Sequence, residues 1–244
     1  MDLSVIVPCL DEEENVSEVV TRLARVFDDE RLRARGGAEL VIVDDGSSDA
    51  TWSEMMRMQS THAFVVPVRH PHNRGLAAAW RTGLDHARGR LICILDADLQ
   101  YRPEDIRSLY DSLESSRADI VQGYRSPSRR ERDVRYFVSR ALHHVLNGLF
   151  AMDLEDNKSG FLLCPRDVFN DLLDYKSKYT YWQLFVGVAA HAKGYSICQI
   201  ETAFEPRRHG RSFLSDLPLL PMLRASADLA TAIREYGSRP RQKR

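Results

Sequence analysis

The sequence lacks the features that would mark a membrane-spanning or nucleic-acid-binding chain. Its 244 residues contain no run of the ~20 apolar residues that a spanning helix needs, and two prolines interrupt the nearest stretch, 217–223. The formal net charge is only -1, which argues against a dedicated nucleic-acid binder. Repeats and low-complexity tracts are absent too, apart from a short cationic tail over 239–244.

Cysteine is scarce and scattered. The four residues, Cys9, Cys93, Cys164 and Cys198, lie far apart, mostly in apolar contexts that are typical of strands. A zinc or redox site would need closer spacing, so we interpret them as small buried hydrophobes in a reducing cytosol. Because the first strand is predicted to start at Leu3, we expect no secretory leader and a cytoplasmic protein.

What the chain does have is an alternation of apolar strands and amphipathic helices. The strands are predicted over 3–7, 40–43, 63–68, 91–95 and 160–164, and helices over 16–27 and 76–87. Strands that alternate with helices pair in parallel through right-handed crossovers. The length fits one large domain. We therefore expect an α/β fold with a mostly parallel sheet.

Polar residues follow three of the predicted strands at once. The segments are Pro8 to Glu12, Asp44-Asp45 and Asp96 to Asp98. In open parallel sheets, ligands bind beyond the carboxyl ends of the strands. The sequence therefore predicts a polar site at this edge of the sheet.

Asp96, Asp98 and Gln100 place three oxygen ligands at alternate positions. Residues two apart in an extended chain point the same way, so these side chains can converge on one point. A hard divalent cation such as Mg²⁺ or Mn²⁺ takes oxygen ligands and commonly shares them with substrate phosphates. The alternative is that Asp98 caps a following helix; the preceding strand and the two neighbouring polar loops favour the metal.

Asp44 and Asp45 allow two interpretations. With Gly46 and Ser47 they could form an ordinary turn into a helix. Alternatively, an aspartate at a strand end accepts hydrogen bonds from a base N–H or a ribose hydroxyl. Neither a Gly-x-Gly-x-x-Gly motif nor a phosphate-binding lysine loop is present, so a nucleotide would be held in another way.

Several spaced motifs carry a resemblance to a known family. They are 7–15 (VPCLDEEEN), 43–51 (VDDGSSDAT), Asn73-Arg74-Gly75 with Gly83, 96–104 (DADLQYRPE), 123–125 (GYR), 156–161 (DNKSGF) and 207–213 (RRHGRSF). In this order they resemble glycosyltransferase family 2, the inverting nucleotide-sugar enzymes of the type A fold, and within it the dolichyl-phosphate mannose synthases and related polyprenyl-phosphate glycosyltransferases. The resemblance covers roughly residues 3–213. No processive-synthase motif is present.

The resemblance implies a fold and a division of the chain. The fold is a Rossmann-like, mostly parallel sheet with helices on both faces. Residues 1–124 would form the nucleotide-sugar-binding half and 125–213 the acceptor-binding half of the same domain. A C-terminal helical extension with the basic tail would occupy 214–244.

The resemblance also implies roles for individual residues. Donor contacts are expected from Pro8, Leu10, Glu12, Asp44, Asp45, Asn73, Gly75, Asp96 and Ala97. The Mg²⁺ or Mn²⁺ ligands are expected to be Asp96, Asp98 and Gln100, and the catalytic residues Asp98, Arg125 and Arg207. Acceptor contacts are expected from Arg125, Asp156, Ser159, Gly160, Arg207 and Ser212. Leu10 replaces a usual aromatic, which leaves the base open, and Phe213 replaces a usual lysine, for which Arg208 or Arg211 would substitute.

A polyprenyl phosphate is the acceptor that we favour. An acceptor phosphate is already ionised and needs no general base, whereas a hydroxyl does. No carboxylate after Tyr124 lies in a recognisable base motif, while six arginines between Arg125 and Arg140 face only Glu131 and Asp133. These arginines could hold the phosphate or a lipid surface, or form a solvated basic face.

The C-terminal stretch from Leu217 to Tyr236 leaves three partners open. Its apolar and cationic residues suit a peripheral membrane anchor. Asp228 and Glu235 weaken that interpretation, and packing against the chain's own core or a second subunit fits as well.

Competing functions use the same loops. They are transfer to a soluble hydroxyl acceptor, nucleotidyl transfer and non-catalytic binding of a nucleotide sugar. A glycosidase fits poorly, because its two carboxylates flank a bond from opposite sides, whereas Asp96 and Asp98 lie in one loop.

Overall fold

The computed structural model describes residues 1–125, 134–157, 159–206 and 219–237. Within them, seven strands form one sheet in the order β3-β2-β1-β4-β6-β5-β7. The strands are β1 (Leu3–Cys9), β2 (Ala38–Asp44), β3 (Val65–Arg69), β4 (Leu91–Ile94), β5 (Ile120–Tyr124), β6 (Leu162–Pro165) and β7 (Ile197–Glu201). All neighbours pair in parallel except β6, which runs antiparallel to β4 and β5. The expected mostly parallel sheet is confirmed.

The central strands are apolar on both faces because both faces are covered. In β1 every residue is buried, and alternate side chains join different cores. Val5 and Val7 belong to one core, and Ile6 belongs to the other. This explains why the sequence shows a continuous apolar run there rather than strict alternation.

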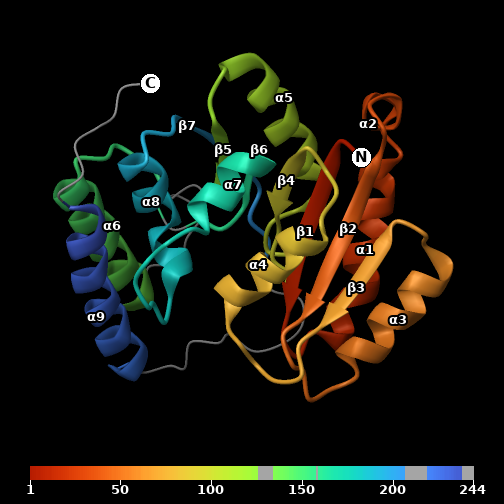
Figure 1. Cartoon of the computed structure of the whole chain (residues 1–244), viewed down its shortest axis with the longest axis horizontal. Coiled ribbons are helices and arrows are strands. Elements are labelled where there is room, and N and C mark those ends of the chain that lie inside the picture. Colours follow the sequence, from red (N-terminus) through yellow and green to blue (C-terminus); the bar gives the residue numbers. More distant parts are fainter. Residues whose placement is uncertain (126–133, 158, 207–218, 238–244) are drawn as a thin grey trace.

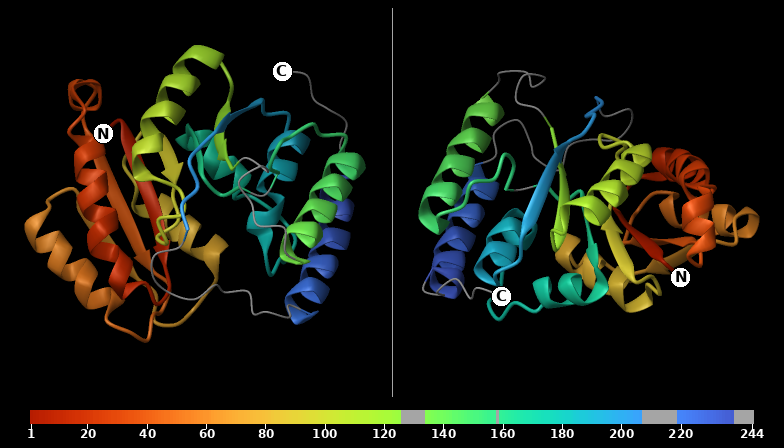
Figure 2. Two further views of the ribbon diagram at one scale, coloured as in Figure 1. Left: turned by 180° about the vertical axis from the view of Figure 1, so that it is seen from behind. Right: turned by 90° about the horizontal axis from the view of Figure 1, so that it is seen from above.

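Helices lie on both faces of the sheet, as expected (Figures 1 and 2). The first core contains residues of α1 (Glu13–Phe27), α3 (Thr51–Thr61) and α5 (Ile106–Ser116). The second contains residues of α4 (Leu76–His86), α6 (Val134–Phe150), α7 (Arg166–Leu172), α8 (Val186–Ala192) and α9 (Leu219–Tyr236). The short elements are α2 (Glu30–Ala34), η1 (Pro103–Asp105) and η3 (Trp182–Phe185). The helices α6 and α9 lie together at the end of the molecule away from α3 (Figures 1 and 2).

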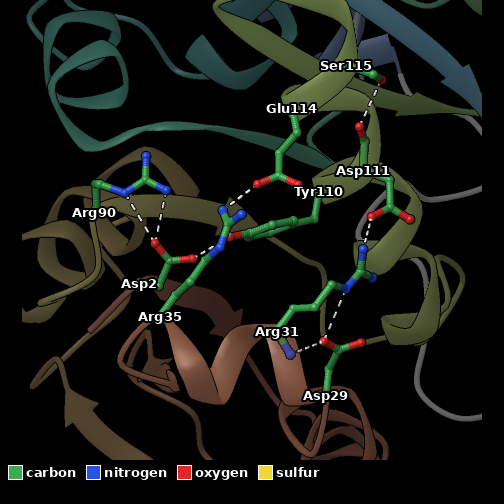
Figure 3. Close-up of polar contacts among 9 residues, drawn as sticks. All are labelled: Asp2, Asp29, Arg31, Arg35, Arg90, Tyr110, Asp111, Glu114 and Ser115. Atoms are coloured by element: carbon green, nitrogen blue, oxygen red, sulfur yellow. Dashed lines mark hydrogen bonds and ion pairs between the residues drawn. The ribbon is translucent and has the colours of Figure 1, made fainter.

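A charged cluster closes the amino end of the sheet. The carboxylate of Asp2 accepts hydrogen bonds from the hydroxyl of Tyr110 (2.5 Å) and from the guanidinium of Arg90 (3.0 Å). Arg35 donates to Tyr110 and pairs with Glu114 on α5 (Figure 3). Asp2, Arg35 and Arg90 come just before β1, β2 and β4, respectively. The cluster therefore lies at the opposite end of these strands from the predicted site.

The predicted division of the chain at 124 and 213 stays a prediction. The sheet itself runs across the first boundary, because β4 pairs with β6. All four cysteines are free; Cys9, Cys93 and Cys164 are buried, and Cys198 is half-buried.

Candidate active site

The carboxyl ends of β1, β2 and β4 meet at one edge of the sheet. β1 pairs in parallel with both other strands, and the register places Cys9 opposite Asp44 and Ile6 opposite Ile94. The loops that follow therefore converge, as the sequence predicts. Pro8 and Asp44 themselves belong to the strands, which run one or two residues further than expected.

Hydrogen bonds join the loop after β1 to the loop after β2. The backbone N–H of Asp11 donates to Ser47 Oγ (3.0 Å), and that of Glu12 donates to Thr51 Oγ1 (2.8 Å). In return, the carboxylate of Asp11 accepts from the N–H of Ser48 (2.8 Å). These bonds fix the predicted donor residues Leu10 and Glu12 relative to β2. The sequence analysis did not assign Ser47 or Thr51 this role.

Asp45 anchors the loop before α4. Its buried carboxylate accepts from the N–H groups of Arg74 (2.9 Å) and Gly75 (2.8 Å). His70 Nδ1 lies 2.6 Å from the same carboxylate, and His70 Nε2 lies 2.8 Å from Thr82 Oγ1. Asp45 thus brings β2, β3 and α4 together, and His70 is a partner that the sequence analysis missed.

Asp44 is fully buried and has turn contacts. Its Oδ1 accepts from the N–H of Ser47 (2.8 Å), and Arg69 Nε lies 3.0 Å from its Oδ2. The Arg69 guanidinium also lies over the Trp52 ring, 5.6 Å from its centroid. The turn interpretation therefore describes what the side chain does in this structure, and a donor contact stays a prediction. The predicted donor residue Asn73 is exposed and accepts from the N–H of Gly75 (3.0 Å).

The predicted metal ligands lie in the loop after β4, which forms a turn and not the extended chain that the prediction assumed. Asp96 is half-buried, Ala97 is buried, Asp98 is 8% exposed and Gln100 is half-buried. Asp98 Oδ1 accepts from the N–H of Gln100 (3.1 Å) in a tight turn where Leu99 adopts a φ of 58°. Asp98 caps no helix, because η1 begins after Arg102 and α5 after Asp105. The helix-cap alternative is therefore wrong.

Hard oxygen donors fit Mg²⁺ or Mn²⁺, which bind few protein carboxylates and take other ligands from phosphates or water. In the part of the chain that the structure describes, no group of three or more His, Cys, Asp or Glu side chains is arranged to hold a metal ion. A metal held here would thus depend on two carboxylates and the amide of Gln100, with the donor completing its coordination.

The acceptor-side residues lie beside this loop. The Arg125 guanidinium stacks 4.2 Å above the Phe204 ring, and Asp156 and Ser159 are buried. Gly123 is required here, because a Cβ would lie 2.5 Å from Phe161 Cδ1. Predicted residues Arg207 and Ser212, with the rest of 207–213 and the arginines over 126–133, lie outside the described residues.

Two buried groups near the site are held neutral. Burial raises the pKa of the Cys9 thiol, and the carboxylates of Glu12, Asp44 and Asp49 raise it further. Burial also raises the pKa of the Tyr101 hydroxyl. A thiol that stays protonated is a poor nucleophile.

The helix α9 packs against its own chain. Ala232 and Tyr236 are buried in the second core. The carboxylate of Asp228 accepts from the N–H groups of Thr180 (3.1 Å) and Tyr181 (2.7 Å). Packing against the core is thereby the observed role of this face, whereas membrane contact and oligomerisation stay predictions. Across the described residues, no helix has the length and apolarity to cross a bilayer.

Named relatives are similar to this chain in sequence. A dodecaprenyl-phosphate galacturonate synthase of Rhizobium johnstonii is 32% identical over 157 residues, which are 64% of this chain and 45% of that protein. A dolichol-phosphate mannosyltransferase of Pyrococcus furiosus is 26% identical over 230 residues, 92% of this chain and 62% of that protein. The chain spans about half the length of the curated relatives it matches.

Solved structures share the fold. The glucosyl-3-phosphoglycerate synthase of Mycobacterium tuberculosis, crystallised with Mn²⁺, uridine diphosphate and phosphoglyceric acid, superposes with a TM-score of 0.71 at 17% identity, covering 98% of this chain and 79% of that one. This likeness confirms the expected type A fold.

The model of glycosyl transferase family 2 matches residues 4–173, well over half of the sequence. That match spans β1 to α7 and thus includes the converging loops and the Asp96–Gln100 turn. The chain belongs to glycosyl transferase family 2.

Proposed function

We propose that the chain is a metal-dependent inverting glycosyltransferase that moves a hexose from a nucleoside-diphosphate sugar to a polyprenyl phosphate. The observation that carries the proposal is the convergence of the β1, β2 and β4 loops on one edge of the sheet, with Asp96 and Asp98 at the end of β4. Family membership and the names of the relatives support it.

The donor would lie across the carboxyl ends of these strands. The loop after β1 and the Asn73–Gly75 loop frame this edge, and hydrogen bonds to the loop after β2 hold both in place. Asp98, Asp96 and Gln100 would hold a divalent ion. Such an ion supplies positive charge that offsets the charge growing on the departing diphosphate.

In the transfer, an acceptor oxygen attacks the anomeric carbon as the bond to the diphosphate breaks. The electron pair of that bond leaves with the nucleoside diphosphate. Arg125, fixed by its stack on Phe204, offers a planar fork that suits phosphate oxygens. Arg207 would add a second such fork. Because a phosphate acceptor is ionised, no side chain has to remove a proton from it.

Asp98→Asn tests the proposal. The amide has the shape of the carboxylate but lacks its charge, so Mn²⁺ binding and sugar transfer should both be lost while the unfolding midpoint stays. Asp111→Asn is the matched control, since Asp111 is a surface carboxylate of α5 that pairs with Arg31 (Figure 3). Unchanged transfer in Asp98→Asn, or in the wild type with chelator, would overturn the proposal.

A soluble acceptor is the second candidate. It is favoured by the match of nearly the whole chain to a fold neighbour that was crystallised with phosphoglyceric acid. Incubating radiolabelled nucleotide sugars with Mn²⁺ and either a short polyprenyl phosphate or phosphoglyceric acid separates the two. Label that enters the organic phase supports the lipid acceptor. Label that appears in a new anionic product in the aqueous phase supports the soluble acceptor.

A further inference from the structure

Tyr101 joins two parts of the predicted site that are far apart in the sequence. It directly follows the metal loop, residues 95–100, and its side chain is buried. The ring stacks on Phe161 with centroids 5.0 Å apart and meets the edge of Phe204 at 5.1 Å. Phe161 belongs to the acceptor segment, residues 159–161.

The direction of the hydrogen bond between Tyr101 and Ser159 follows from the single hydroxyl proton of serine. Tyr101 Oη lies 3.1 Å from Ser159 Oγ. The single hydroxyl proton of Ser159 is donated to the carbonyl of Gly123 (2.6 Å), so Ser159 can only accept from Tyr101. Ser159 Oγ also accepts from the N–H of Phe161 (3.3 Å). The Tyr101 hydroxyl is therefore a donor to the acceptor segment.

Further hydrogen bonds hold this segment to β5, and β5 is held in turn by β7. Gln122 Nε2 donates to the carbonyl of Ser159 (2.7 Å), and Gln122 Oε1 accepts from Gln199 Nε2 (2.6 Å). Gln122 lies on β5 and Gln199 lies on β7. They hold Ser159 against the sheet, whereas the Tyr101 contact links it to the metal loop.

Backbone contacts stiffen the same junction. Tyr101 forms an antiparallel bridge with Phe204, and the N–H of Glu205 donates to the carbonyl of Gln100 (2.8 Å). A shift of the metal loop should therefore carry Tyr101 with it, and the bond from the Tyr101 hydroxyl should pass that shift to Ser159.

We propose that Tyr101 is a positioning residue that couples the metal loop to the acceptor segment, so that a divalent ion with its diphosphate orders the segment where the acceptor binds. The proposal rests on the proposed function, because it requires a metal at Asp96 and Asp98. Coupling of this kind is reciprocal, so an acceptor at Ser159 would also tighten binding at the metal loop.

Amide hydrogen exchange tests the coupling without turnover. The probes are Mn²⁺ with uridine diphosphate and Mn²⁺ with guanosine diphosphate, added to the wild type, Tyr101→Phe and Tyr110→Phe. Tyr110 is the matched control, since it is also buried and its hydroxyl also donates to a side chain, Asp2, at the far end of the strands (Figure 3).

The expected result is slower exchange at 95–100 and at 159–161 in the wild type and in Tyr110→Phe. In Tyr101→Phe the slowing at 95–100 should remain while that at 159–161 is lost. If exchange slows only at 95–100 in the wild type, the coupling is overturned while the proposed function stands. No response at 95–100 with either probe overturns the proposed function and the coupling with it.

Ser159→Ala gives a second route to the same bond. If the hydroxyl contact carries the coupling, Ser159→Ala and the double variant with Tyr101→Phe should transmit no slowing to 160–161, and the two losses should not add. Transmission that persists in both variants overturns the proposal, since the aromatic stack alone would then suffice.

Discussion

His70 Nδ1 lies 2.6 Å from Asp45 Oδ1, between the end of β3 and the loop that opens α4. This contact makes His70 a positioning residue for the Asn73–Gly75 loop, because Asp45 binds the N–H groups of Arg74 and Gly75 with the same carboxylate.

His70→Ala should weaken donor binding. Removing one partner of a buried carboxylate costs about 1.5–3 kcal/mol, and if half of that reaches the loop, the donor KM rises about 4- to 13-fold with little change in kcat. His70→Asn should restore most of the affinity, since its Nδ2 can take the place of Nδ1. Steady-state kinetics check both variants, with the exposed His86→Ala on α4 as control. Equal donor KM values in His70→Ala and the wild type would contradict this role.

Gly46→Ala should distort the same loop. Gly46 has a φ of +80°, and a Cβ there would lie 2.4 Å from the backbone carbon of His72. The backbone of 72–73 must therefore move, in addition to the roughly 1 kcal/mol that a left-handed conformation costs a non-glycine residue. We expect a lower unfolding free energy and weaker binding of Mn²⁺ with the nucleoside diphosphate, measured by urea denaturation and calorimetry.

Gly75→Ala separates strain from collision. Its φ is +89°, yet a Cβ at Gly75 meets no atom within 4 Å. Gly75→Ala should lose only the backbone contribution, about 1–3 kcal/mol for its φ of 89° and ψ of 160°. We expect Gly46→Ala to be the more destabilised variant, because it adds the collision with His72. Equal losses would show that the close approach to His72 is relaxed at no cost.

The sequence predicts β1, β2, β3, β4 and β6 but misses β5 and β7, which lie together at one side of the sheet. Continuous apolar runs mark β1, β2 and β4, because each is covered on both faces. β5 contains Gln122 and Gly123, and β7 is a half-buried edge strand with Gln199 and Glu201, so neither has an apolar pattern that the analysis could detect. Their pairing joins segments about 77 residues apart, which no local pattern encodes.

The sequence indicates the acidic residues of the candidate site but not the side chains that hold them in place. Polar residues after apolar strands indicate Asp44, Asp45, Asp96 and Asp98 directly. Their partners are not indicated, because the contacts of His70 with Asp45 and of Tyr101 with Ser159 depend on strand register and packing across long separations. Whether each predicted residue binds donor, metal or acceptor stays a prediction.

Glu39 should make stability depend on pH. Burial raises the pKa of its carboxyl, but hydrogen bonds from Ser4 and Arg88 outweigh this, and the pKa is lowered. The unfolded chain thus binds the proton more readily, so the stabilisation is present above the ordinary pKa of about 4.5 and is lost as the pH falls through the lower native value. Urea denaturation between pH 3 and pH 7 measures it.

Glu39→Gln should be less stable than the wild type at pH 7 and show a shallower loss of stability in acid. Glu114→Gln is the control, because Glu114 pairs with Arg35 at the surface (Figure 3), where such pairs contribute little. Parallel pH profiles for Glu39→Gln and the wild type would refute the assignment.

Asp228→Ala should loosen α9 from the core. The buried carboxylate accepts from the N–H groups of Thr180 and Tyr181, and its removal leaves them without these bonds at a cost of about 1–3 kcal/mol. Trp182 directly follows Tyr181 as the first residue of η3 and stacks on Tyr175 with centroids 4.9 Å apart, so tryptophan fluorescence should report the change. The control Arg234→Ala removes an exposed side chain of α9 and should stay within about 0.5 kcal/mol. If α9 served chiefly as a surface anchor, Asp228→Ala would leave the urea midpoint and the fluorescence unchanged.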